Sequence, residues 1–414
     1  MSETRASVVV VSRGRSNELA KCLKALRLQF YPNFEIVVVA DQGGCAVVSG
    51  LGLQDHVKTV PFGEPNISAA RNLGINHAAG EIVAFIDDDA IAEPTWLKNL
   101  TAPFVREDVA AAGGFVRGRN GISFQWKGEL LDCAGQSRSI NVEEMTVIRG
   151  TAEKSVKTQG TNCAFRRELL ERLGGFDESY AYFMDETDLN LRIGAAGHST
   201  AIVPDAEVQH LVASNSVRGS DRAPKSLYQI GASYAYFLRK QRLGDEFWIE
   251  FAQQQRGRLL RAMVAGQLEP RDVFRLMQEL EEGRADGRLR EHRLKKAFAT
   301  APDFKPAVVE GEAPQSHVIS GRFGQRKKLY TEARRLATQG RAVTVFCFWP
   351  NALFHKRWFH PDGFWVQSGG IFGKSSRSDP LISFRSRMSR IKRELNAIRK
   401  TRGLGDGVKI DASF

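Results

Sequence analysis

Short, almost wholly apolar runs alternate with longer amphipathic stretches over residues 7–86. The apolar runs predict strands at 7–11, 35–40, 57–60 and 82–86, and the amphipathic stretches predict helices at 17–28 and 67–79. Asn66 or Ser68 is placed to cap the second helix and Gly80 to end it, while the glycine-bearing residues 41–44 are expected to form a turn. Continuous apolar strands joined by helical crossovers are typical of a parallel sheet covered on both faces, so the predicted fold class is α/β.

The pattern changes farther along the chain. Residues 226–299 are predicted to be a helical extension, and the Pro-bearing, weakly hydrophobic residues 300–316 a linker. Residues 317–414 form a separate C-terminal module, with an aromatic, strand-like segment at 343–349 and a basic helical tail. We therefore expect the first domain to span residues 1–225. The cations of the tail, opposed by Glu394, are Arg385, Arg387, Arg390, Lys392, Arg393, Arg399, Lys400 and Arg402.

Composition narrows the class of protein. With 42% hydrophobic and 26% charged residues, the chain can bury a sizeable core, and no stretch approaches the ~20 apolar residues of a membrane span. Five scattered cysteines without a CxxC pair indicate neither a disulfide framework nor a zinc site, so we expect a cytoplasmic protein. The net charge of +12 favours a polyanionic partner: nucleic acid, an acidic membrane face or phosphorylated substrates.

Polar side chains follow the predicted strands where each of them ends. Ser12 and Arg13 follow the first strand, Asp41 follows the second, and the triplet Asp87-Asp88-Asp89 closes the run 82–86. Ligands of such sheets bind beyond these carboxyl ends. On an extended backbone, Asp87 and Asp89 point to the same side and can face one divalent cation. The alternative for the triplet alone is a polar strand end beside a turn.

Three further segments carry candidate chemistry. Arg71 and Asn72 stand near a helix start, where backbone N–H groups favour anions. Residues 160–167 form a small-residue strand that lets a ligand approach the backbone. Asp185 and Glu186 precede a helical stretch, and His210 follows later. Acidic residues in a first helical turn also serve as dipole partners, and a single histidine is often structural.

Taken in this order, the segments resemble the family 2 glycosyltransferases, which have the GT-A fold. The resemblance covers residues 7–211, about half of the chain. It rests on an ordered set of motifs: a first strand ending in a Ser-containing segment, an Asp after the second strand, an A-R-N-x-G helix, a D-x-D motif, a G-x-N segment before G-G-F-D-E, two adjacent acids and a late His. Each motif alone is weakly specific, and the ordered set is highly specific.

The resemblance implies a GT-A, Rossmann-like domain that transfers a sugar from a nucleotide diphosphate donor with inversion. It places Mn²⁺ or Mg²⁺ on Asp89 and His210, where a cation can stabilise the charge of the leaving diphosphate. It makes Glu186 the base that takes the acceptor's proton and Asp185 a ligand of the acceptor hydroxyl. Family members usually read Glu then Asp, and this chain reverses them, so the two roles could exchange. The donor-binding residues implied are Ser12, Arg13, Asp41, Arg71, Asn72, Asp87, Asp88 and Asn162.

We therefore expect an inverting, metal-dependent hexosyltransferase that uses a UDP-, GDP- or TDP-sugar and a glycan or lipid-linked acceptor in exopolysaccharide or cell-envelope synthesis. One alternative is a nucleotidyltransferase, although residues 12–16 are too poor in glycine for its triphosphate loop. Another is a non-catalytic nucleotide- or nucleic-acid-binding protein on a transferase-like fold, which the basic tail favours. The tail itself either docks on an anionic membrane face, making the protein peripheral, or is a solvated helix. Residues 369–375 resemble a phosphate loop, but Ser368 replaces its leading glycine.

Overall fold

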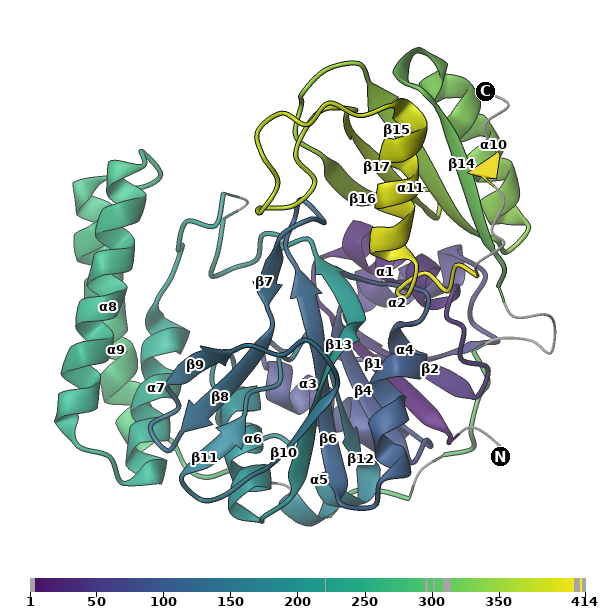
Figure 1. Ribbon diagram of the computed structural model, residues 1–414. Helices are drawn as coiled ribbons and strands as arrows, with labels where there is room; N and C mark the ends of the chain where they lie inside the picture. The colour runs from purple at the N-terminus through teal and green to yellow at the C-terminus, as the bar shows by residue number, and fades with distance from the viewer. Residues whose placement is uncertain are drawn as a thin grey trace.

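The computed structural model describes residues 4–219, 221–294, 297–300, 302–307, 314–405 and 410–411. Within these residues the chain forms an α/β domain, a helical extension beside it and a smaller C-terminal module packed on the α/β domain (Figure 1). No helix in these described ranges combines the length and the apolar composition needed to cross a bilayer.

The α/β domain is built on a ten-stranded mixed sheet. Its strands lie in the order β10-β13-β6-β12-β4-β1-β2-β3, with β5 paired to β13 and β7 to β6, and a second sheet has the order β11-β8-β9. The strands are β1 Ala6–Ser12, β2 Phe34–Ala40, β3 Val57–Pro61, β4 Ile82–Asp87, β5 Ala90–Ala92, β6 Val109–Arg117, β7 Phe124–Trp126, β8 Gly128–Asp132, β9 Ser137–Ile140, β10 Thr146–Arg149, β11 Lys154–Val156, β12 Cys163–Arg166 and β13 Ser199–His210.

The predicted parallel sheet is confirmed for its first half. Strands β3, β2, β1 and β4 are parallel neighbours, and their apolar side chains alternate between two buried cores. Val8 and Val10 pack in one core, and Val9 packs with Ile75 in the other. Beyond β4 the prediction is incomplete, because β12 runs antiparallel to both β4 and β6. The sheet is therefore mixed.

Six α-helices belong to the described part of this domain, and one of them forms where the sequence pattern predicted a turn. The predicted turn at 41–44 is wrong, because residues Gln42–Gly50 form a helix whose first N–H groups are capped by Asp41. A Cβ on Gly44 would lie 2.5 Å from the Cβ of Ala40, so a glycine lets this helix pack closely on β2. The helices are α1 Ser16–Leu26, α2 Gln42–Gly50, α3 Ile67–His77, α4 Trp96–Thr101, continued by a 3₁₀ turn at Ala102–Val105, α5 Arg167–Leu173 and α6 Asp185–Ala195.

Asn66 caps α3 as predicted, since its side chain accepts a hydrogen bond from the N–H of Ala69 at 3.0 Å. Gly80 does not end this helix, which stops at His77. A Cβ on Gly80 would lie 2.6 Å from the carbonyl carbon of Ala6, so this glycine lets the chain pass close to β1.

The helical extension consists of α7 Tyr228–Gln241, α8 Asp245–Val264 and α9 Pro270–Leu289. Helices α7 and α9 approach closely, because a Cβ on Gly283 or Gly287 would lie 2.1 Å from a carbonyl oxygen of α7. The extension shares a hydrophobic core with Tyr180 and Leu191 of the α/β domain. Lys240 on α7 also pairs with the buried carboxylates of Asp177 and Asp188. The extension is therefore packed onto the α/β domain through both apolar and charged contacts.

The C-terminal module is a five-stranded sheet with a helix on each face. Its strands lie in the order β16-β17-β15-β14-β18. Helix α10 packs on one face, in a core with Phe364, and α11 packs on the other, in a core with Phe346 and Phe348. The elements are β14 Ser316–Arg322, a 3₁₀ turn at Phe323–Gln325, α10 Arg326–Thr338, β15 Ala342–Trp349, β16 Lys356–His360, β17 Phe364–Gly370, α11 Arg387–Ile398 and β18 Ile410–Asp411.

The module contacts the α/β domain directly. Phe359 and Trp365 pack against Ala25 and Leu28 at the end of α1 and just beyond it. The buried Arg402 forms a salt bridge with Glu93, with Nε and Oε2 2.8 Å apart. Of the segment predicted as a linker, residues 302–307 run beside the start of β2, and 308–313 lie outside the described residues.

Candidate active site

A pocket of about 440 Å³ opens at the carboxyl ends of β1 and β4. Side chains from distant stretches of the chain line it together. They include Arg15 after β1, Asp87 and Asp89 at the end of β4, Glu186 on α6 and His210 at the end of β13. The prediction that polar side chains gather at this edge of the sheet is confirmed for Asp87 and Asp89, whereas Arg15 was not predicted.

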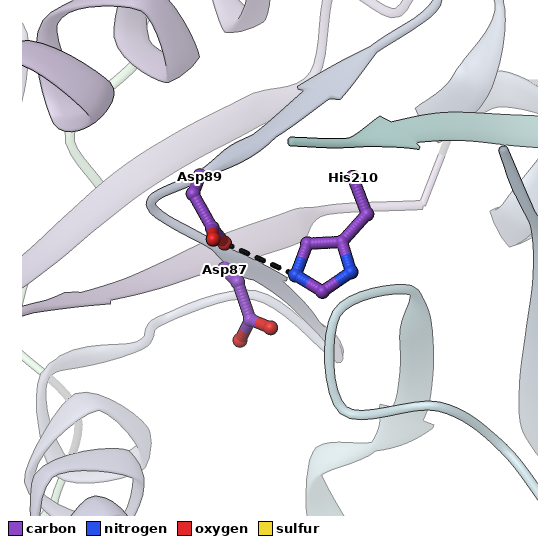
Figure 2. Close-up of side chains that lie close together, drawn as sticks. All are labelled: Asp87, Asp89 and His210. Atoms are coloured by element: carbon purple, nitrogen blue, oxygen red, sulfur yellow. Dashed lines mark ion pairs between the residues drawn. The ribbon is translucent and has the colours of Figure 1, made fainter. Parts of the chain in front are cut away.

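Strand pairing brings His210 to the aspartates. Strand β13 pairs with β5 so that His210 lies opposite Ala90, the residue after Asp89. The side chain of His210 then points at Asp89, with Nε2 and Oδ1 3.3 Å apart, and Asp87 lies beside them (Figure 2). One ligand atom from each of the three residues lies within 4.8 Å of the others. The two predicted metal ligands are thus neighbours, and Asp87, which the resemblance assigned to the donor, joins them.

The chemistry of this Asp87-Asp89-His210 cluster fits a hard divalent cation. Two carboxylates and one imidazole suit Mn²⁺ or Mg²⁺. The Nδ1 atom of His210 lies 3.3 Å from Oε1 of Gln125, and donation of its proton there leaves the Nε2 lone pair facing the aspartates. Among the described residues, the buried Oδ1 of Asp89 has no hydrogen-bond partner, as expected of an atom placed to bind an ion.

Asp89 is held as a carboxylate. Burial acts to raise the pKa of Asp89, but the neighbouring imidazole of His210, the charge of Arg15 and the N–H of Ala213 together lower it to about 2. The Ala213 N–H donates to Oδ2 at 2.7 Å, and this contact leaves Oδ1 for another partner. Val212, between His210 and this donor, has a φ of 56°, which is a strained conformation for a β-branched residue.

Asp88 points away from the cluster into the protein. Its Oδ2 accepts a hydrogen bond from Ser12 at 2.7 Å, and its Oδ1 lies 2.7 Å from Arg15. Burial raises the pKa of Asp88 to about 8 although Arg15 opposes this effect. Arg15 itself also reaches Asp89, at 3.2 Å. Arg13, the predicted ligand, instead donates to the carbonyl of Gly63 at the protein surface.

Asp185 and Glu186 open α6 at the bottom of the same pocket. The two residues before them, Phe183 and Met184, have φ values of 72° and 70°. Two consecutive non-glycine residues in the left-handed region are costly, so tertiary contacts hold this turn in place. The turn places both residues in the wall of the pocket that also holds the Asp87-Asp89-His210 cluster, rather than on the protein surface.

The pKa values of Asp185 and Glu186 are shifted in opposite directions. Burial, together with the charge of Glu186, raises the pKa of Asp185 well above its usual value although Arg71 lies against it. Burial also acts to raise the pKa of Glu186, but a hydrogen bond from Asp185 and the charge of Arg71 lower it. Glu186 is therefore the member of the pair that is ionised and able to accept a proton.

Arg71 connects the acid pair to the Asp87-Asp89-His210 cluster. It donates a hydrogen bond to Asp185 and lies 3.6 Å from Asp87, with its guanidinium over the ring of Phe176. A Cβ on Gly160 would lie 2.4 Å from this guanidinium, so the glycine makes room for it. At Gly160 the group that approaches the backbone is therefore an arginine of the chain. The approach of a ligand to residues 160–167 stays a prediction.

Three predicted donor ligands lie elsewhere and have partners within the protein. Asn72 is buried and exchanges hydrogen bonds with the backbone of Phe176. Asn162 accepts from the indole of Trp96 and donates to two carbonyls. Asp41 caps α2 and accepts from the N–H of Gly14. None of the three lines the pocket described above.

Sequence reasoning missed several pocket residues. Arg15 was overlooked because Gly14 has a φ of 68°, and this turn directs Arg15 rather than Arg13 into the pocket. Lys157, Arg218 and Arg258 also line it, the last from α8. Of these missed residues, only Arg15 could have been suspected from the sequence, because a glycine that permits a turn separates it from Arg13.

Comparisons with known proteins place this domain. The sequence profile described as "Glycosyltransferase like family 2" matches residues 4–224. The O-antigen biosynthesis protein RfbC of Myxococcus xanthus is 24% identical over 246 residues, which are 56% of this chain and 19% of that protein. The glucosyl-dolichyl phosphate glucuronosyltransferase of Haloferax volcanii is 27% identical over 188 residues, 42% of this chain and 56% of that one. The chain thus spans only about a fifth to just over half of these relatives.

Solved structures include the mannosyltransferase PcManGT of Pyrobaculum calidifontis in complex with GDP-Man and Mn²⁺. It has a TM-score of 0.44 and 19% identity over 69% of this chain and 87% of its own. GalNAc-T7 with UDP, GalNAc and Mn²⁺ has a TM-score of 0.45 and 16% identity over 57% of this chain and 48% of its own.

The α/β domain is a transferase domain of the GT-A class. With more than half of its residues matched by the family profile, the chain belongs to glycosyltransferase family 2.

Proposed function

We propose that the protein is an inverting, metal-dependent glycosyltransferase that moves a sugar from a nucleotide diphosphate donor to a glycan or lipid-linked acceptor. The observation that supports this most is the shared pocket of the Asp87-Asp89-His210 cluster and the Asp185–Glu186 pair. One group suits a cation on a diphosphate, and the other suits a base for an acceptor hydroxyl. The Asp87-Asp89-His210 cluster and the Asp185–Glu186 pair both lie within residues 4–224, which match the glycosyltransferase family 2 profile.

The residues divide the reaction between them. Bound Mn²⁺ or Mg²⁺ would be held by Asp89 and His210 with Asp87, and would neutralise charge on the leaving diphosphate. Glu186 takes the proton of the acceptor hydroxyl as its oxygen bonds to the anomeric carbon, and the bond from that carbon to the diphosphate oxygen breaks. Attack opposite the leaving group inverts the anomeric centre. Asp185, the protonated partner, then donates a hydrogen bond to Glu186 or to the acceptor.

The remaining predicted ligands have two kinds of role in this proposal. Arg71 and Arg15 bring positive charge to the pocket and can face the diphosphate. Ser12 and Asp88 hold Arg15 in place. Arg13 precedes Gly14, and Asp41 accepts a hydrogen bond from the N–H of Gly14. The donor roles that the resemblance implies for these two residues require the nucleoside to extend beyond the pocket. Asn72 and Asn162 support the walls of the pocket through hydrogen bonds within the protein.

We propose a role in the synthesis of a cell-envelope glycan or exopolysaccharide, supported by the similarity to RfbC, named for O-antigen biosynthesis. The nucleic-acid alternative loses part of its basis, because two cations of the basic tail are buried. Arg390 pairs with Glu394, and Arg402 pairs with Glu93.

A donor panel tests the proposal. The protein is mixed with Mn²⁺ and UDP-, GDP- or TDP-sugars, and thermal stability and donor hydrolysis are measured. We expect one donor to raise the melting temperature only with metal, and Asp89→Asn to abolish this effect. Glu186→Gln should keep the donor-dependent stabilisation and lose hydrolysis and transfer. Asp55→Asn, at an exposed site outside the pocket, is the matched control. A wild-type protein indifferent to every donor, with or without metal, contradicts the proposal.

A further inference from the structure

The C-terminal module exposes large apolar side chains on two loops at the carboxyl ends of its parallel strands. One loop, 350–355, follows β15, and the other, 371–386, follows β17. Both are the yellow-green and yellow loops above β7 in Figure 1. The apolar side chains of these loops are between 55% and 88% exposed. They are Leu353, Phe354, Leu381, Ile382 and Phe384.

These loops are held together by their backbones. The N–H of Gly370 donates to the carbonyl of Leu353 at 2.8 Å, and the N–H of Ser383 donates to the carbonyl of Phe372 at 2.9 Å. The rings of Phe372 and Phe384 are in contact, with centroids 5.7 Å apart. The exposed side chains thus form one built surface rather than scattered surface residues.

The glycine-rich run that resembled a phosphate loop serves this packing. A Cβ on Gly370 would lie 2.1 Å from the carbonyl oxygen of Asn351, and one on Gly373 would lie 1.9 Å from that of Leu353. Both positions therefore need glycine so that the second loop can lie against the first. The packing of the two loops therefore accounts for the glycines of this motif.

Five cations lie within or next to these two loops in the sequence, and no ion pair is found for any of the five among the described residues. Asp379, the acid within the second loop, is taken by Arg393 and by the N–H groups of Ser375 and Ser376. Arg387 is half-buried near Arg322, and its buried Nε and Nη2 atoms have no hydrogen-bond partner among the described residues. The cations that flank the loops without a carboxylate are Lys356, Lys374, Arg377, Arg385 and Arg387.

We infer that this apolar-basic surface, residues 350–356 and 371–388, docks the protein on an anionic lipid bilayer. Apolar side chains that enter the interface and cations that meet acidic headgroups are the two signals that stable peripheral binding requires. A second copy of the chain does not fit the surface, because self-association would bring two sets of unpaired cations together. This membrane contact lies in the two loops and the first residues of α11, whereas the sequence suggested the basic helical tail.

The surface is connected to the pocket rim through one strand. The N–H of Arg357 on β16 donates to the carbonyl of Asn120, and the carbonyl of Arg357 accepts from the side chain of Gln209. Gln209 precedes His210 of the Asp87-Asp89-His210 cluster. Docking through these loops would therefore hold the pocket close to the headgroup layer, where a lipid-linked acceptor is found. This last step rests on the proposed function, whereas the docking itself does not.

Vesicle flotation of the full chain tests the inference. We expect the protein to float with vesicles of equal parts phosphatidylcholine and phosphatidylglycerol, and to stay unbound with phosphatidylcholine alone. Phe384→Ser should weaken vesicle binding by about tenfold or more, because one large apolar side chain no longer enters the bilayer. Arg385→Gln should weaken it less, and added salt should weaken binding of the wild type.

Matched controls come from the helical extension. Phe274 on α9 is 78% exposed, so Phe274→Ser removes a comparable side chain outside the surface. Arg256→Gln does the same for an exposed charge on α8. Both should bind vesicles as the wild type does. Unaltered melting temperatures will show that each variant folds, and unaltered donor hydrolysis will separate this result from a failure of the proposed function.

Three outcomes would overturn the inference. The first is that the wild type does not float with anionic vesicles. The second is that Phe384→Ser and Phe274→Ser float equally. The third is a wild-type dimer that Phe384→Ser dissociates, which would make the surface an interface between copies. Donor hydrolysis without flotation would refute docking and leave the enzyme intact.

Discussion

Lys240→Met tests whether the helical extension holds the helix that carries the proposed base. The Nζ atom of Lys240 lies 2.9 Å from Asp177 and 2.6 Å from Asp188, and both carboxylates are fully buried. Asp188 lies in the first turn of α6, two residues after Glu186. Methionine keeps most of the apolar stem of the lysine and removes its charge, so the substitution leaves two buried carboxylates without this cation.

The expected loss can be estimated in two ways. Removing one partner of a buried ion pair costs about 3–5 kcal/mol of the free energy of unfolding. Burial acts to raise the pKa of Asp177, but Lys240 and Tyr236 lower it from 3.8 to about 2. That shift alone corresponds to about 2 kcal/mol. We expect Lys240→Met to lose about 3 kcal/mol at neutral pH.

The pH dependence provides the sharper test. Because the pKa of Asp177 is lower in the folded protein, its contribution is present above the unfolded value near 4. It is lost as the pH falls from about 4 toward about 2. The wild type should therefore lose stability over this range faster than Lys240→Met. Urea unfolding at a series of pH values measures both curves.

Lys225→Met is the matched control, since Lys225 is exposed and its side chain has no ion-pair partner among the described residues. It should change the free energy of unfolding by about 0.5 kcal/mol or less. Lys240→Arg should recover part of the loss. If Lys240→Met matched Lys225→Met at neutral pH, or if its deficit stayed constant in acid, the ion-pair reasoning would be refuted.

Three further substitutions probe the pocket. Gly160→Ala should displace the Arg71 guanidinium and lower donor hydrolysis by about tenfold or more, while circular dichroism stays unchanged. Asn162→Ala should lower the free energy of unfolding by about 1–3 kcal/mol and alter the fluorescence of Trp96, but leave nucleotide affinity as in the wild type; weaker nucleotide binding at full stability would restore a donor role. Arg15→Met should tighten the binding of Mn²⁺ alone, because it removes a competing cation, and should weaken the binding of UDP in the presence of Mn²⁺. Calorimetric titration measures both affinities, and a fall in both would contradict this prediction.

Strand and helix periodicity predicted the parallel half of the sheet well, because strands buried on both faces must be apolar throughout. It failed at α2, where Gly43 and Gly44 are typical of a turn. The helix forms there because Asp41 caps it and because it packs on β2 too closely for a side chain at Gly44. Such a requirement comes from tertiary packing, which no local pattern records.

Motif order predicted the candidate site in outline, and the local backbone decided its details. Asp87 and Asp89 face the pocket as alternation suggested, although residues 88 and 89 form a turn rather than an extended strand. Asn72 and Asn162 are buried in hydrogen bonds within the protein, and a buried amide that shapes a wall has the same sequence signature as one that binds a ligand. Only coordinates distinguish the two.

The net positive charge of the sequence does not show which cations remain available to a partner after the chain has folded. The sequence places eight cations in one basic tail, yet Arg390 and Arg402 are buried beside Glu394 and Glu93 and contribute nothing to a surface potential. Arg385, a few residues earlier, is exposed beside apolar side chains and keeps its full charge for a partner. A surface for anions is therefore identified by the cations that lack a carboxylate in the folded chain, and net charge cannot tell these from the cations that the fold neutralises. In this protein five such cations lie on or beside the two loops of the apolar-basic surface, whereas Arg390 and Arg402 of the tail are paired with buried acids.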